Sequence, residues 1–208
     1  MFASLNNDGD GAWISGVVNA PILRATADPN SNAWIELASK LGQVAFQILK
    51  DTPTANGVVT LVTSGKELSD KKFLSIGVLV GLLGGMVQKD VNLVNAQTLA
   101  EEIGLQVGQQ HSANGEANSY LVLRIKYPNQ TVEIKGTTDG QRQYLESING
   151  AVFEPDGVVL TDQASLIVKP VNPNDLSKTV GEFLHKIPHK VAITRGSAPW
   201  IAVQLPSN

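Results

Sequence analysis

The chain of 208 residues contains no cysteine, and this absence excludes several chemistries at once. It can form no disulfide, supply no thiolate to zinc and hold no iron–sulfur cluster through sulfur. The lack of disulfides fits a reducing compartment, so we expect a cytoplasmic protein. The N-terminus also lacks the basic flank and sustained apolar core of a secretory signal.

Basic clusters and long apolar runs are missing as well. The formal net charge is −3 with no local gathering of Lys or Arg, which leaves no electrostatic footprint for nucleic acid or an anionic membrane. The most apolar stretch, residues 73–86, is shorter than the ~20 residues that span a bilayer. We therefore expect neither nucleic acid nor membrane as a partner.

No catalytic, cofactor or metal constellation emerges from the sequence. A glycine-rich G-x-G-x-x-G turn between a strand and a helix is absent, so NAD has no evident site. His185 and His189 have the spacing of a helical zinc pair, but Pro188 interrupts the helix between them. We expect no catalytic, cofactor-binding or metal-binding residue in this chain.

Hydrophobic residues make up 42% of the chain, enough for a core, and their spacing predicts the elements. Apolar positions at helical intervals predict a helix that is capped by Ser31 or Asn32 and ends near Lys50. The β-branched run 57–65 between glycines predicts a buried strand.

Residues 73–86 are apolar on every side, which predicts a helix that is buried all round and begins near Ser69. Gly77 and Gly81 lie four apart on this helix. They would let another helix approach closely, and we expect a subunit contact there.

A third helix is predicted over 96–103, because apolar residues recur at helical spacing. Asn92 or Asn95 could accept a hydrogen bond from an N–H of its first turn, and Gly104 could end it in a left-handed conformation. A short strand should follow at 105–107, and the polar run 108–118 indicates a loop.

Alternating apolar and polar residues then predict a β-hairpin over 119–127 and 130–135 with one solvent-exposed face. The last segment changes in pattern and predicts a smaller unit with the order strand, helix, strand, strand. Its expected elements are strands at 158–160 and 165–168, a helix opened by residues 172–175, and strands at 191–194 and 200–205.

Several short motifs resemble one family. They are Val17-Val18-Asn19-Ala20, Val91-Asn92-Leu93-Val94-Asn95-Ala96, Glu101-Glu102-Ile103-Gly104-Leu105, Gly136-Thr137-Thr138 and Ile148-Asn149-Gly150-Ala151-Val152-Phe153. Together they resemble the C-terminal part of D-3-phosphoglycerate dehydrogenases, the animal enzymes above all, over roughly residues 14–153.

The resemblance implies an α/β (α+β) fold with two units. After a flexible start at 1–13, residues 14–153 would form an allosteric-substrate-binding, or intervening, domain. Residues 154–208 would form a partial ACT-like β-α-β-β unit that stops before its final helix and strand.

The resemblance further implies the regulatory and oligomerisation part of an NAD-dependent oxidoreductase, the first enzyme of L-serine biosynthesis from 3-phosphoglycerate. NAD would belong to the parent protein, and the partners would be its own catalytic domains, further copies in a homo-oligomer and a small-molecule effector. The alternative is a free-standing ligand-binding or scaffold domain. A similar domain occurs in iron–sulfur serine dehydratases, but this chain has no cysteine to hold a cluster.

Six residues are candidates for ligand or regulatory contacts. Two lie in the repeated Val-Asn-Ala motif, three lie on or near the Ile-Asn-Gly turn where bacterial relatives hold a phosphorylated acid, and one corresponds to the serine-sensing site of ACT domains. They are Asn19 and Asn95, then Lys135, Arg142 and Asn149, and finally Lys169.

Overall fold

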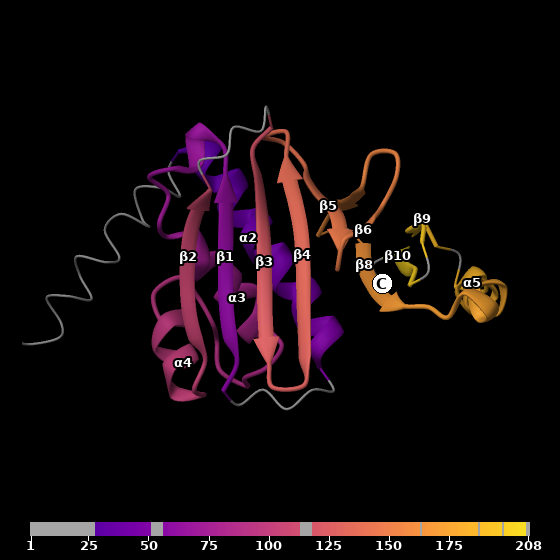
Figure 1. The fold of residues 1–208 in the computed structure, drawn as a ribbon, viewed down its shortest axis with the longest axis horizontal. Helices are drawn as coiled ribbons and strands as arrows, with labels where there is room; N and C mark the ends of the chain where they lie inside the picture. Colours follow the sequence, from indigo (N-terminus) through magenta and orange to yellow (C-terminus); the bar gives the residue numbers. More distant parts are fainter. Residues whose placement is uncertain are drawn as a thin grey trace, which may run out of the picture.

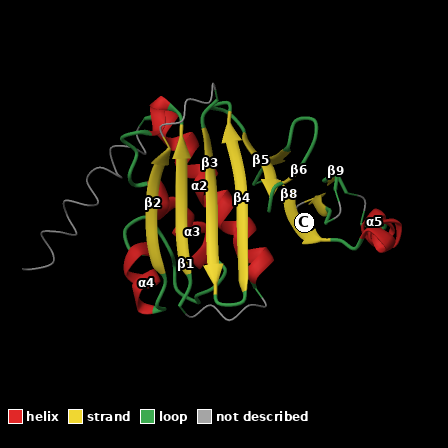
Figure 2. Ribbon diagram, viewed as in Figure 1, coloured by secondary structure: helices red, strands yellow, loops and turns green. Residues whose placement is uncertain are grey.

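The computed structural model describes residues 28–50, 56–112, 118–162, 164–186, 188–196 and 198–206. The predicted flexible start at 1–13, the beginning of the predicted first domain at residue 14 and the candidate Asn19 all lie outside these ranges. In the described part, a broad sheet carries helices on one face, and a smaller sheet with its own helix lies beside it (Figures 1 and 2).

The larger sheet has seven strands in the order β2-β1-β3-β4-β5-β6, with β7 also paired to β5. β1 and β2 run parallel, and the other pairs are antiparallel. The strands are β1 (Val58–Ser64), β2 (Gln106–Ser112), β3 (Tyr120–Tyr127), β4 (Gln130–Thr138), β5 (Gln143–Ile148), β6 (Ala151–Val152) and β7 (Val158–Leu160).

Two long helices cover one face of this sheet, and the opposite face is open to the viewer in Figure 1. The helices of this unit are α2 (Pro29–Leu49), α3 (Leu74–Gly84), α4 (Ala96–Glu102) and the short 3-10 turn η1 (Lys66–Leu68). None of the described helices is both long and apolar enough to cross a membrane.

The smaller sheet has the order β8-β10-β9, all antiparallel. Its elements are β8 (Ala164–Pro170), the 3-10 turn η2 (Pro173–Asp175), α5 (Leu176–Leu184), β9 (Lys190–Ile193) and β10 (Trp200–Pro206). The mixed α/β class with two sheets confirms the predicted fold class. Since β7 joins the larger sheet, the smaller sheet begins only at Ala164; the domain division at residue 154 and the ACT-like character remain predictions.

Glycines allow α2 and α3 to pack backbone against backbone. A Cβ atom at Gly81 would overlap the carbonyl oxygen of Ser39, and one at Gly42 would overlap that of Val78. Every non-glycine residue would therefore push the two helices apart. The predicted close helix contact at Gly77 and Gly81 is confirmed, but the partner is α2 of the same chain and not a second subunit.

Some element boundaries differ from the sequence predictions because tertiary contacts decide them. The cap of α2 is Asp28, whose carboxylate accepts a hydrogen bond from the N–H of Ser31, so the predicted caps Ser31 and Asn32 lie inside the helix. Helix α3, predicted over 73–86, begins at Leu74 rather than near Ser69, since the side chain of Gln109 on β2 accepts the Ser75 N–H.

The region around α4 contains one confirmation and two corrections. Gly104 does end the helix with φ +77°. The Asn92 side chain accepts the N–H groups of Val94 and Asn95, so it fixes the turn ahead of α4 rather than capping its first turn. Residues 108–112, predicted as loop, continue β2, because β1 supplies a parallel partner along their whole length.

Strand β10 joins the two sheets through the alternation of its side chains. Trp200 and Ala202 enter the main core together with Val168, whereas Ile201 and Val203 form a second core with Phe183 of α5. The smaller sheet is therefore packed between the main domain and its own helix. The main core thus extends from the larger sheet to the side of the smaller sheet that faces it.

Polar contacts from α2 fix the position of the smaller sheet. The Gln47 side-chain amide donates to the Leu166 carbonyl (2.7 Å) and accepts the Val168 N–H (3.3 Å), as a neighbouring strand would. Two turns earlier, Lys40 Nζ donates to the Leu160 carbonyl (3.0 Å) and pairs with Asp162 (3.5 Å). The edge of β8 is thereby closed by a helix side chain.

The glycine contact predicts a contrast between two substitutions on α3. Gly81→Ala should lower the free energy of unfolding by about 1–3 kcal/mol, because its methyl group meets the α2 backbone. Gly84→Ala should be neutral or stabilising by up to about 1 kcal/mol, since nothing lies near that position. Urea denaturation measures both, and equal effects would contradict the proposed packing.

The Gln47 contact predicts local opening when its amide is lost. Gln47→Ala should speed hydrogen exchange at the Val168 N–H and lower the free energy of unfolding by about 1–3 kcal/mol. Gln43→Ala, at an exposed position on the same helix, is the matched control and should change little. Unchanged exchange at Val168 in Gln47→Ala would refute the docking role.

Candidate functional site

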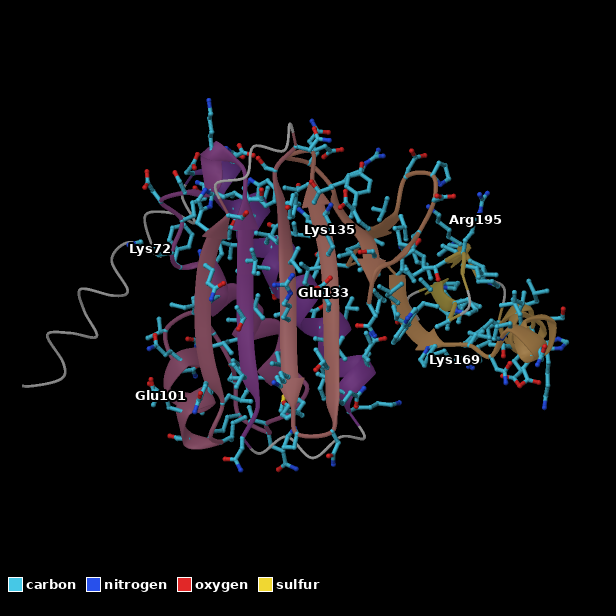
Figure 3. All side chains as sticks on the ribbon, viewed as in Figure 1. Lys72, Glu101, Glu133, Lys135, Lys169 and Arg195 are labelled. Carbon is cyan, nitrogen blue, oxygen red and sulfur yellow. The ribbon has the colours of Figure 1, made fainter. Side chains whose placement is uncertain are left out.

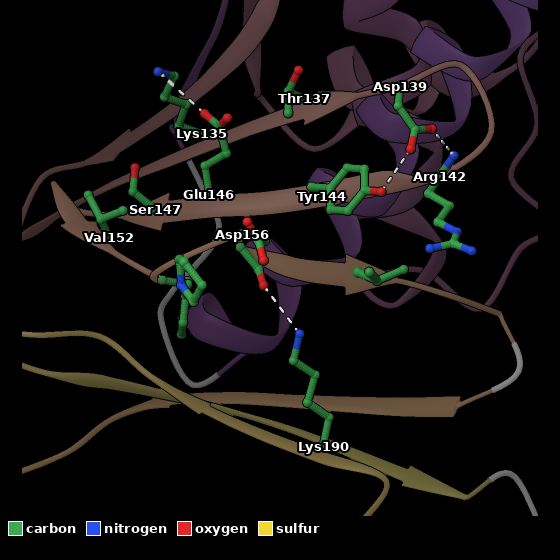
Figure 4. Close-up of a pocket in the computed structure, with 14 residues that line it drawn as sticks. Lys135, Thr137, Asp139, Arg142, Tyr144, Glu146, Ser147, Val152, Asp156 and Lys190 are labelled. Carbon is green, nitrogen blue, oxygen red and sulfur yellow. Dashed lines mark hydrogen bonds and ion pairs between the residues drawn. The ribbon is translucent and has the colours of Figure 1, made fainter.

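A cavity of about 790 Å³ opens on the uncovered face of the larger sheet, at the end nearest the smaller sheet (Figure 4). We call it the basin. Its polar lining comes from β4, β5, the turns around them and one lysine of β9: Lys135, Thr137, Asp139, Arg142, Tyr144, Glu146, Ser147, Asp156 and Lys190. Its remaining lining is Val152, Phe153, Pro155, Gly157 and Val159.

A β-bulge shapes one wall of the basin. The register of β4 against β5 shifts between Lys135 and Gly136, which leaves Glu146 as the extra residue on β5. Lys135 Nζ lies 3.3 Å from the Glu146 carboxylate and 4.2 Å from the centre of the Tyr120 ring. The charge of Lys135 is thus already matched inside the protein.

The turn between β4 and β5 fixes the far rim. The Asp139 carboxylate accepts the N–H groups of Gln141 (2.8 Å) and Arg142 (2.7 Å) and the hydroxyl of Tyr144 (2.8 Å). The hydrogen bond from the Arg142 backbone N–H is the largest cause that lowers the pKa of Asp139. The hydrogen bond from the Tyr144 hydroxyl is the second. The same carboxylate raises the pKa of Tyr144, so acid and phenol hold each other in place.

Besides Lys135 and Arg142, the basin has a third basic residue, Lys190, which comes from the smaller sheet. Lys190 Nζ on β9 donates to the Gly157 carbonyl at 3.4 Å, next to the exposed Asp156 (Figure 4). Gly157 has φ +73°, and a Cβ there would press on the Leu145 carbonyl, so the turn requires glycine. The basin is complete only where the two sheets meet.

The structure brings two of the six sequence candidates together, Lys135 and Arg142. Asn149 is a turn residue: its φ is +49° and its side chain accepts the Glu133 N–H at 2.8 Å. Asn95 is occupied in the loop before α4, where its amide donates to the Asp90 carbonyl.

Lys169 lies away from the basin, on β8 beside α5 (Figure 3). Its Nζ is 3.8 Å from Glu182 and 4.9 Å from the Phe183 ring centre. It therefore stabilises the second core and does not meet Lys135 or Arg142 in one site. Its role in ligand binding stays a prediction.

Sequence reasoning missed several residues of the basin. Asp139 could have been found from the Asp139-Gly140-Gln141-Arg142 turn, in which an acidic side chain commonly binds the backbone that follows. Lys190 carried no such signal, because it reaches the basin from a different sheet. No group of histidine, cysteine and carboxylate side chains suited to a metal ion occurs among the residues that the structure describes.

Comparison with known proteins now gives the family. The family model described as the D-3-phosphoglycerate dehydrogenase intervening domain matches residues 31–149. The chain belongs to this family. Those residues run from α2 through β5, and they include Lys135 on β4, Tyr144 on β5 and Arg142 in the turn between the two strands.

Three animal relatives bear the name D-3-phosphoglycerate dehydrogenase. The proteins from Pan troglodytes, Sus scrofa and Homo sapiens are 30%, 34% and 34% identical and cover 95%, 82% and 76% of this chain. The matches span 38%, 33% and 30% of the relatives' own lengths. This member of the intervening-domain family thus spans about a third of the length of each of these relatives.

The Asp139–Tyr144 pair predicts a shift that titration can measure. Asp139→Asn removes the negative charge that favours the protonated phenol, so the pKa of Tyr144 should fall toward the ordinary 10.0. Carbon-detected NMR titration of the tyrosine ring measures it. Tyr127, whose pKa is raised by burial, is the internal reference and should not move; an unmoved Tyr144 would contradict the pairing.

Proposed function

We propose that this chain is the regulatory and assembly part of a D-3-phosphoglycerate dehydrogenase, the NAD-dependent oxidoreductase that begins L-serine biosynthesis from 3-phosphoglycerate. The observation that carries the proposal is the family match over residues 31–149, combined with coverage of only about a third of the relatives. The parent protein would act in the cytoplasm.

The proposed lack of catalysis rests on how the glycines are used. A dinucleotide site needs glycines that expose a helix N-terminus to the pyrophosphate. Gly81 instead lies within α3 and packs on the backbone of α2, and Gly85 packs on the ring of Phe46. These glycines support helix packing and leave no room for a cofactor.

The basin supports the regulatory part of the proposal. It joins side chains of both units, so a ligand bound there would favour the arrangement in which Lys190 of the smaller sheet lies at a cavity lined mainly by the larger sheet. Its effector is a small molecule, since the cavity of about 790 Å³ lies in the usual range for such ligands.

Assembly into a homo-oligomer is the other half of the proposal. The helix pair first considered for this contact is already covered within the chain, so self-association requires another surface. The uncovered face of the larger sheet offers exposed side chains such as Val58, Arg124 and Lys126.

A free-standing ligand-binding or scaffold domain is the second candidate. It is favoured by the core that the described residues complete on their own, with α2, α3 and both sheets in contact. The reading frame next to this coding sequence distinguishes the two candidates. A strand–turn–helix with a glycine-rich dinucleotide motif supports the dehydrogenase, and its absence supports the free-standing domain.

Two measurements on the purified chain test the proposal. With NAD and 3-phosphoglycerate, we expect no NADH formation and no NAD binding by calorimetry. Light scattering should give at least the mass of a dimer. Saturable NAD reduction that copurifies with the chain would overturn the non-catalytic role, and a monomer mass would overturn the assembly role.

A further inference from the structure

The charges that line the basin cancel. Lys135, Arg142 and Lys190 supply three positive charges, and Asp139, Glu146 and Asp156 supply three negative ones, so the formal net charge of the lining is zero. A phosphate monoester carries about −1.5 to −2 charges at neutral pH. Such a ligand would meet as many carboxylates as cations here.

Several of these charges already have partners inside the protein. Lys135 pairs with Glu146 at 3.3 Å. Both carboxylate oxygens of Asp139 accept hydrogen bonds from its own turn and from Tyr144. A ligand would gain little from these groups, because their hydrogen bonds would have to break first.

The groups that remain are of both signs. The Arg142 side chain is exposed beside Tyr144, and a guanidinium carries five N–H donors with which it could bind a ligand. Lys190 makes one long hydrogen bond to a backbone carbonyl at 3.4 Å. The Asp156 carboxylate next to it is exposed. A ligand therefore meets cations and one carboxylate.

Between these groups the lining is apolar. Val152, Pro155 and Val159 line the cavity beside Asp156, and Val152 is 49% exposed. An exposed valine on a β-strand beside a cavity offers apolar area that a ligand could cover. The lining thus combines exposed cations, one exposed carboxylate and apolar side chains.

We propose that the basin binds a zwitterion of the amino-acid or dipeptide class with an apolar side chain. Arg142 would hold its carboxylate in a cavity that also contains the Lys190 cation. Asp156 would hold its ammonium group, and Val152, Pro155 and Val159 would contact its side chain. The inference rests on the proposed function, in which the basin is the effector site, and names the chemical class of that effector.

Both ends of such a ligand contribute to recognition. Guanidinium groups bind carboxylates through two parallel hydrogen bonds. An ammonium group that lost its water without a carboxylate partner would cost free energy, so Asp156 selects for it. Phosphorylated hydroxy acids lack an ammonium group, and their negative charges would be repelled by the same Asp156.

The probes are chosen to remove one charge at a time. L-Leucine, L-phenylalanine and L-alanyl-L-leucine are the zwitterions, N-acetyl-L-leucine lacks the ammonium group, L-leucinamide lacks the carboxylate, and inorganic phosphate represents the anion. Calorimetric and NMR titration of the chain should show binding by at least one zwitterion. Each blocked form should bind about tenfold more weakly or worse.

One substitution should reverse the selectivity. Asp156→Asn removes the ammonium partner and the repulsion of anions together. It should weaken zwitterion binding about tenfold and strengthen binding of N-acetyl-L-leucine and phosphate. Asp70→Asn, the same charge change at an exposed position away from the basin, is the matched control and should change neither.

The outcomes separate this inference from the proposed function. Phosphate binding that exceeds every zwitterion, or an equal effect of Asp156→Asn on all probes, overturns the zwitterion class and leaves an effector site in place. Failure of every probe to bind overturns both the class and the effector role. NAD turnover by the chain would overturn the proposed function alone.

Discussion

The close contact between α2 and α3 is the constraint on which the rest of the structure depends. Gly42 and Gly81 let the two backbones touch, so α2 has one position against the sheet. From that position its Lys40 reaches Leu160 at the end of β7, and its Gln47 reaches Leu166 within β8. The smaller sheet then places Lys190 at the basin. A glycine contact in the core thus determines the geometry of a surface cavity.

Much of this fold was predictable where local pattern and tertiary contact agree. The run of residues 73–86 is apolar on all sides and too short to span a bilayer, which predicted a buried helix, and its glycines indicated close packing. The pattern could not predict which helix packs on these glycines, since any helix with small residues could approach them closely. The hairpin over 119–127 and 130–135 was equally clear, because apolar and polar residues alternate along both of its strands.

The failures have physical causes in long-range hydrogen bonds. Residues 108–112 are polar and contain glycine, yet β1 pairs with them and makes a strand. The start of α3 is set by Gln109, more than thirty residues along the chain. In the basin, Lys135 and Arg142 were predicted from one stretch of sequence. Asp156 was not, because it reaches the basin through the pairing of β6 and β7 with β5. Lys190 was not, because it comes from the other sheet.

The central claim is that α2 joins both sheets into one cooperative unit. Trp34 lies on α2 and Trp200 on β10, and both are buried in the same core. Urea unfolding of the unaltered chain, followed at the same time by the resolved indole N–H signals of Trp34 and Trp200 in NMR spectra, tests the claim most directly. Coincident midpoints and slopes are predicted. A Trp200 transition at clearly lower urea than the Trp34 transition would show that the smaller sheet unfolds on its own and would contradict the account.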